Sequence, residues 1–242
     1  MAHLGLSGFN WEVCKAAPRD VYVMLGRSIF ERSRMTRRLL PAAFQLVLLL
    51  MFAALPPATM SAPANPAATT IQNFYDELLA TMKDGSQLGM QGRYNRLAPA
   101  VDAAFDLPTM TAFAVGPNWA SYSPADQKAL TDAFRRMTIA SYASNFKSYD
   151  GEKFMVAPDT KQAGTDQVVL SQLVPAKGDP VSLNYRMRQA AGGWKIIDVY
   201  SAGYVSELAR RRSDFSGIVA SGGAAALIKK LNDLSDNMLK GS

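Results

Sequence analysis

A change in hydrophobic period along the chain constrains its fold more than any single motif. Apolar residues recur every three or four positions from about residue 66 to 146, alternate from about 152 to 203, and return to helical spacing up to the end. Turn residues at hairpin spacing separate the alternating segments, which favours antiparallel neighbours. This order predicts an α+β fold, with a curved four-stranded antiparallel sheet covered by N- and C-terminal helices that enclose an apolar cavity.

The expected helices begin and end at recognisable signals. The first runs from Pro66 to a stop at 83–85, the second spans 86–104, and a short one carries Met110 and Phe113. Ser123 followed by proline is the clearest start signal and opens a helix that ends near 149–151. The last two helices, 205–221 and 224–239, are expected to be separated by a glycine pair.

Four strands are expected between these helices, at 153–157, 167–174, 181–189 and 194–200. In the third strand Val181, Leu183, Tyr185 and Met187 alternate with polar residues, the period of a sheet with one buried face and one wet face.

The segment 35–64 has the layout of a secretory signal peptide. A basic start at 35–38 precedes an uninterrupted apolar run at 46–55, about half the roughly 20 residues that a membrane-spanning helix needs. Ala62-Pro63-Ala64 is an A-x-A cleavage signal that would release a chain beginning at Asn65. We therefore predict export and cleavage, with an uncleaved anchor as the alternative. Residues 1–34 are interpreted as a mis-called or extended N-terminus, and residues 65–242 as one domain.

The only histidine and cysteine, His3 and Cys14, both precede this segment, so the exported domain would have neither imidazole nor thiol. Those groups supply many nucleophiles, near-neutral bases and soft metal ligands, and we expect no metal, cofactor or disulfide. The net charge of +6 mostly reflects the leader, because residues 65–242 hold 19 basic and 17 acidic side chains. Nucleic-acid binding is therefore not indicated.

An enzyme remains an alternative because carboxylates, lysines, serines and tyrosines are present, although no common catalytic signature occurs. Asp198, between two apolar strand residues, is the most interesting carboxylate. Its simpler interpretation is a charge on the wet face, or a partner for Arg186 or Arg188 on the neighbouring strand. The run 210–212 of three arginines spreads around a helix and is mostly a solvated surface, though one or two could meet an anionic headgroup or a partner protein.

An ordered set of short motifs resembles a known family. It comprises Ser141-Tyr142-Ala143, Tyr149-Asp150-Gly151-Glu152, Asn184-Tyr185-Arg186, Gly193-Trp194-Lys195-Ile196-Ile197-Asp198-Val199, and Arg211-Arg212-Ser213-Asp214-Phe215 followed by Ile218 and Gly222. In that order they resemble the periplasmic lipid carriers typified by MlaC and the toluene-tolerance proteins, over nearly all of the exported domain. One loop, 203–212, looks instead like the hopanoid-associated HpnM branch.

The resemblance implies an NTF2-like fold and a non-enzymatic periplasmic shuttle. Its ligand would be a phospholipid or a hopanoid, and its partners an inner-membrane ABC transporter complex and an outer-membrane protein. A hopanoid-pathway accessory enzyme or an adaptor on the same fold is the alternative. A carrier agrees with the physics, because each methylene removed from water is worth about 0.8 kcal/mol and lipid tails need an apolar container.

The candidate lipid-binding residues are those that fall on the expected inner faces of the helices and strands. Methionines among them suit irregular apolar contents, although each residue taken singly is equally a core residue. They are Phe105, Met110, Phe113, Phe134, Met137, Leu183, Tyr185, Met187, Ile197, Val199 and Tyr204.

Overall fold

The computed structural model describes residues 65–240, and the predicted leader and N-terminal extension lie outside that range. Its elements follow the predicted order: helices α2 (Pro66–Lys83), α3 (Gly85–Ala104), α4 (Leu107–Val115) and α5 (Pro124–Asn145), a sheet, and helix α6 (Glu207–Leu239). A short 3-10 helix, η2 (Gly116–Ser121), follows α4. The α+β fold is as expected, with one more strand than the sequence indicated.

The sheet is antiparallel throughout, in the order β1 (Lys153–Ala163), β2 (Asp166–Val174), β3 (Val181–Ala190), β4 (Gly193–Ser201) and β5 (Val205–Ser206). The alternation predicted for β3 is confirmed, because its apolar residues are buried and the polar ones between them are not. β1 is longer than predicted and passes through Pro158, with a register shift between Val156 and Thr160. Proline is tolerated there because β1 is an edge strand.

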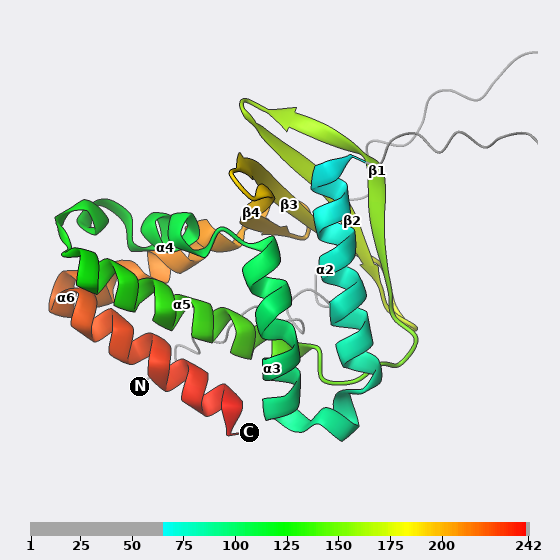
Figure 1. Cartoon of the computed structure of the whole chain (residues 1–242), viewed down its shortest axis with the longest axis horizontal. Helices are drawn as coiled ribbons and strands as arrows, with labels where there is room; N and C mark the ends of the chain where they lie inside the picture. Colours follow the sequence, from blue (N-terminus) through cyan, green and yellow to red (C-terminus); the bar gives the residue numbers. More distant parts are fainter. Residues whose placement is uncertain (1–64, 241–242) are drawn as a thin grey trace, which may run out of the picture. The chain divides into compact units, whose positions relative to one another are not determined.

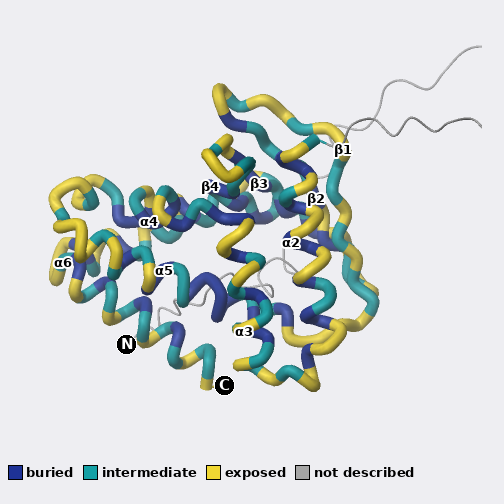
Figure 2. The backbone as a smooth tube through the Cα atoms, in the orientation of Figure 1, coloured by how far each residue is buried: buried dark blue, intermediate teal, exposed yellow. Residues whose placement is uncertain are grey.

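Helix α2 lies across one face of the sheet and packs on β1, β2 and β4, whereas α5 and α6 run side by side away from it (Figure 1). The predicted helix starts at Pro66 and directly after Ser123 are confirmed. Asn65 caps α2, and Ser123 caps α5 by accepting the Asp126 N–H at 3.1 Å. The tube in Figure 2 shows the buried residues on the facing sides of these elements.

Helix α6 begins two residues later than predicted, because Val205 and Ser206 pair with β4 instead. The predicted break near Gly222-Gly223 is confirmed as a kink. Gly223 has φ 60° and ψ −152°, a conformation that glycine adopts without the cost a side chain would bring. A similar kink at Gly89 (φ 61°) in α3 was not anticipated.

Asp166, at the start of β2, links β2 to β3 on the polar face of the sheet through two arginines. Its carboxylate is 1% exposed, and its two oxygens accept from Arg186 Nε at 2.7 Å and Arg188 Nε at 2.8 Å. Hydrogen bonding and charge from Arg188, and then from Arg186, hold the pKa of Asp166 below its ordinary value.

Replacing Asp166 with asparagine should lower the free energy of unfolding by about 1–3 kcal/mol at neutral pH, since two guanidinium groups lose their buried acceptor. A carboxylate with a lowered pKa stabilises the fold above its unfolded pKa, and that contribution disappears as pH falls through the folded pKa. Urea unfolding should therefore separate the two proteins at about pH 7, and the difference in their free energies of unfolding should shrink as the pH falls below the ordinary pKa of an aspartate.

Asp132→Asn is the matched control, since it breaks an exposed pair with Lys128. Its expected cost is below about 1 kcal/mol. An equal loss in both variants would contradict the assignment.

Candidate functional site

A cavity of about 50 Å³ lies where the α3–α4 junction, helix α5, strand β4 and the start of α6 meet. Most of its wall is apolar or aromatic, and two charged side chains from α6 complete it. The lining residues are Phe105, Met110, Phe134, Thr138, Ser141, Tyr142, Asn145, Phe146, Val199, Glu207 and Arg211.

The α3–α4 junction is tied directly to the sheet. Phe105 forms an isolated parallel bridge with Ile196, and the Asp106 N–H donates to the Ile196 carbonyl at 2.9 Å. Asp106 also caps α4 by accepting the Thr109 N–H at 3.1 Å, which sets the direction in which α4 leaves the sheet. Phe105 and Met110 are placed in the cavity wall by these contacts.

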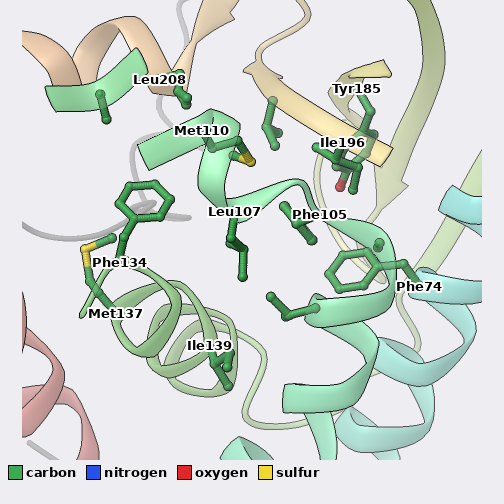
Figure 3. Close-up of a cluster of buried hydrophobic side chains, with 14 of the residues drawn as sticks. Phe74, Phe105, Leu107, Met110, Phe134, Met137, Ile139, Tyr185, Ile196 and Leu208 are labelled. Carbon is green, nitrogen blue, oxygen red and sulfur yellow. The ribbon is translucent and has the colours of Figure 1, made fainter. Parts of the chain in front are cut away.

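Helix α5 supplies one continuous side of the cavity. Phe134, Thr138, Ser141, Tyr142 and Asn145 follow spacings of three and four, so they share one face of the helix. Figure 3 shows Phe134 and Met137 on α5 opposite Met110 and Leu107 on α4, with Phe105 between them and Phe74. Behind this wall, the Phe74 ring packs edge-on against Phe105 and Tyr142, each at 5.2 Å between centroids.

Asp198 fixes the start of α6. Its carboxylate accepts from the Ser206 hydroxyl at 2.6 Å, from the Leu208 N–H at 3.2 Å and from the Val199 N–H at 2.8 Å. Ser206 is the cap of α6 and accepts the Ala209 N–H at 2.9 Å. Asp198 does lie opposite Arg186 in register, as predicted, but the ion pair goes to Asp166 instead. The expectation of an Asp198–arginine pair is therefore wrong, since Asp198 turns to the end of the helix.

Asp198→Asn tests whether this carboxylate caps a helix or carries out chemistry. Burial raises the pKa of Asp198, against the hydrogen bonds from Ser206, Leu208 and Val199. We expect a loss of about 0.5–2 kcal/mol at neutral pH, the range for a lost helix cap. A raised pKa means that Asp198 contributes stability below its unfolded pKa and loses it as pH rises through the folded pKa, so the cost of the substitution should become smaller as the pH rises.

Denaturant unfolding at several pH values checks the Asp198 effect. Ligand binding should survive the substitution. A variant that keeps its stability but loses all function would support catalysis by Asp198.

Glu207 and Arg211 stand one turn apart at the start of α6 and make the charged part of the wall. Glu207 Oε2 pairs with Arg210 at 2.6 Å, and its other oxygen accepts from the Ser201 hydroxyl at 2.9 Å. Arg211 Nη1 donates to the Met137 sulfur at 3.3 Å, and its guanidinium carbon lies 5.9 Å from the centre of the Phe134 ring. Burial lowers the pKa of Arg211.

Four of the predicted residues line the cavity: Phe105, Met110, Phe134 and Val199. Met137, Leu183, Tyr185, Met187 and Ile197 are buried in the core, outside the lining. Phe113 and Tyr204 are 48% and 76% exposed, so their placement on inner faces is corrected. Tyr204 follows a tight turn in which Ala202 and Gly203 both have positive φ, and this turn directs it outward.

The sequence interpretation missed the polar part of the wall. Thr138, Ser141 and Asn145 follow Phe134 on the same helical face, and that spacing is the signal that could have located them. One or two of the arginines at 210–212 were expected to be able to meet an anionic headgroup, but the sequence does not show that Arg211 is the one that turns inward, or that Glu207 lies beside it in the wall.

The sequence model of the MlaC family, described as "MlaC protein", matches residues 72–233 and so spans every element that builds the cavity. The chain belongs to the MlaC family. A solved structure of the phospholipid-binding protein from Ralstonia solanacearum, in complex with a phospholipid, has the same fold. It is 24% identical, with a TM-score of 0.64, and the match covers 72% of this chain and 99% of the other.

Within residues 65–240, none of the helices is long and apolar enough to cross a membrane. In the same part of the chain, no three histidine, cysteine, aspartate or glutamate side chains gather in a way that would hold a metal ion.

Proposed function

We propose that this MlaC-family protein binds a lipid in the cavity between α5, β4 and the start of α6, and carries it through the periplasm. The observation that carries the proposal is the aromatic wall of Phe105, Phe134 and Phe146, closed on one side by polar and charged groups. Such a wall suits an amphipathic ligand with an apolar tail. The phospholipid held by the Ralstonia protein of the same fold supports this.

The cavity must widen to accept a tail. Its volume of about 50 Å³ is well below the roughly 300–1,000 Å³ of ordinary ligand pockets. The first half of α6 is the element best placed to move, because the kink at Gly223 separates it from the second half and glycine tolerates the backbone change. We infer that a lipid enters by displacing residues 209–221 from α5 and α4, while the hydrogen bonds of Asp198 hold the start of α6 in place.

The proposed role as a shuttle is supported by the leader at 35–64, which predicts export, and by the resemblance of the motif set to carriers that work between an inner-membrane ABC transporter and an outer-membrane partner. Cargo is a phospholipid or, following the HpnM-like loop at 203–212, a hopanoid. Asp198 accepts hydrogen bonds from the first residues of α6 and so has a structural role. This favours a carrier over the alternative of an accessory enzyme that would use Asp198.

Native mass spectrometry of the protein purified from the periplasm of its own host tests lipid binding. We expect one lipid per chain, released on denaturation and identified by its mass. A protein that emerges without lipid and acquires none from vesicles of host lipid extract would contradict the proposal. Retention of lipid only by a complex with another protein would favour the adaptor.

A further inference from the structure

Arg211 has an electrostatic setting unlike that of the other arginines in residues 65–240. Six of them pair with carboxylates: Arg96, Arg135, Arg136, Arg186, Arg188 and Arg210. Arg93 donates to the carbonyls of Ala143 and Gly85. Arg212 lies 5.4 Å from the ring of exposed Phe113. Arg211 alone among these nine lines the cavity, and no carboxylate of the described residues lies within ion-pair distance of it.

The partners that Arg211 does have are weak ones. A thioether sulfur is a poor acceptor, and an aromatic face attracts a cation by only about 0.5–2 kcal/mol. The nearest acid in the lining, Glu207, already accepts from Arg210 and Ser201. Glu207 and Asp214 favour the charge on Arg211 from a longer range, whereas Arg210 opposes it.

A guanidinium group stays protonated at any ordinary pH, so Arg211, which is half-buried, cannot relieve the cost of its partial burial by losing its proton. An uncompensated charge in an apolar wall costs free energy, and an anion entering the same space would offset that cost. Arginine also presents a planar fork of donors that matches the oxygens of a phosphate or a carboxylate.

We propose that Arg211 is an anion-binding group inside the cavity, and that the ligand is a lipid whose phosphate or carboxylate lies next to its apolar tail. This inference rests on the proposed function and narrows it. A negatively charged lipid gains a partner at Arg211, whereas a neutral lipid leaves the cation without one. Of the two proposed cargoes, Arg211 therefore favours the phospholipid, which carries a phosphate, over an uncharged polycyclic hopanoid.

Ligands with identical tails and different head groups provide the test. Dioleoyl phosphatidic acid, oleate and dioleoylglycerol share oleoyl chains and differ in carrying a phosphate, a carboxylate or no charge. Each is offered in detergent micelles to the purified protein, and bound lipid is quantified by native mass spectrometry. We expect the phosphatidic acid to bind at least about tenfold more tightly than dioleoylglycerol. The oleate result shows whether a carboxylate serves as well as a phosphate.

Arg211→Met should abolish this preference by weakening the charged lipid and leaving dioleoylglycerol unchanged. Arg212→Met is the matched control, because it removes the same charge from the neighbouring position outside the cavity lining and should keep the preference. Arg211→Gln serves as a second variant if Arg211→Met fails to fold, and it should also remove the preference.

Three results would overturn the inference about Arg211. Equal binding of charged and neutral lipids by the unmodified protein removes the anion site but leaves lipid binding intact. Equal effects of the Arg211 and Arg212 variants point to general surface charge. Binding of none of the three lipids contradicts the proposed function as well.

Discussion

Replacing Phe74 with alanine should lower the free energy of unfolding by about 3–5 kcal/mol, one of the largest losses that a single substitution in this fold can cause. Phe74 is 2% exposed and lies at the centre of the aromatic cluster that joins α2 to the cavity wall. Its ring meets Phe105 and Tyr142 at 5.2 Å, in edge-on geometry that adds to the value of the buried area. Urea unfolding followed by circular dichroism measures the loss.

Phe113→Ala is the matched control for Phe74→Ala. It removes the same side chain from α4, where the ring is 48% exposed and faces Arg212. We expect a cost below about 1 kcal/mol, because little apolar surface returns to water. Similar losses in the two variants would show that Phe74 is not a central core residue.

The contrast between Phe74 and Phe113 shows what the sequence can predict. Phe74 lies in a long helix with a distinct apolar stripe, so period alone places it in the core. Helix α4 has nine residues, nearly all apolar or small, and its pattern does not select one face. The burial of Met110 and the exposure of Phe113 are decided by the Asp106 cap and the attachment to β4, which are tertiary contacts.

The strands show the same division between local and tertiary information. Alternation and turn residues located β2, β3 and β4 to within one residue, because those patterns arise from the pleat itself. β5 is two residues long and has no period to detect. The pairing of Arg186 with Asp166, and not with Asp198 across the ladder, depends on side-chain directions that sequence spacing does not specify.

The candidate site was predictable in its apolar half only. Large apolar side chains indicate a face that avoids water, and four of the proposed residues do line the cavity. Thr138 and Ser141 are buried there as well, although small polar residues in a helix are common on exposed faces. The cavity lies beside these two residues because a larger side chain at either position would fill it. The sequence does not show this, because it depends on how α5 packs against β4 and α6.

Thr138→Phe should therefore close the cavity and reduce lipid retention by at least about tenfold, because the phenyl ring takes the space that the tail needs. Thr138 is 8% exposed, and its hydroxyl donates only to the Phe134 carbonyl of its own helix, so no contact between elements is lost. Thr131→Phe is the control, since its hydroxyl makes the same kind of bond to Gln127 outside the cavity lining. Co-purified lipid per chain, measured by native mass spectrometry with unfolding curves alongside, should fall for Thr138→Phe alone. Undiminished lipid in a folded Thr138→Phe protein would place the binding site elsewhere in the molecule.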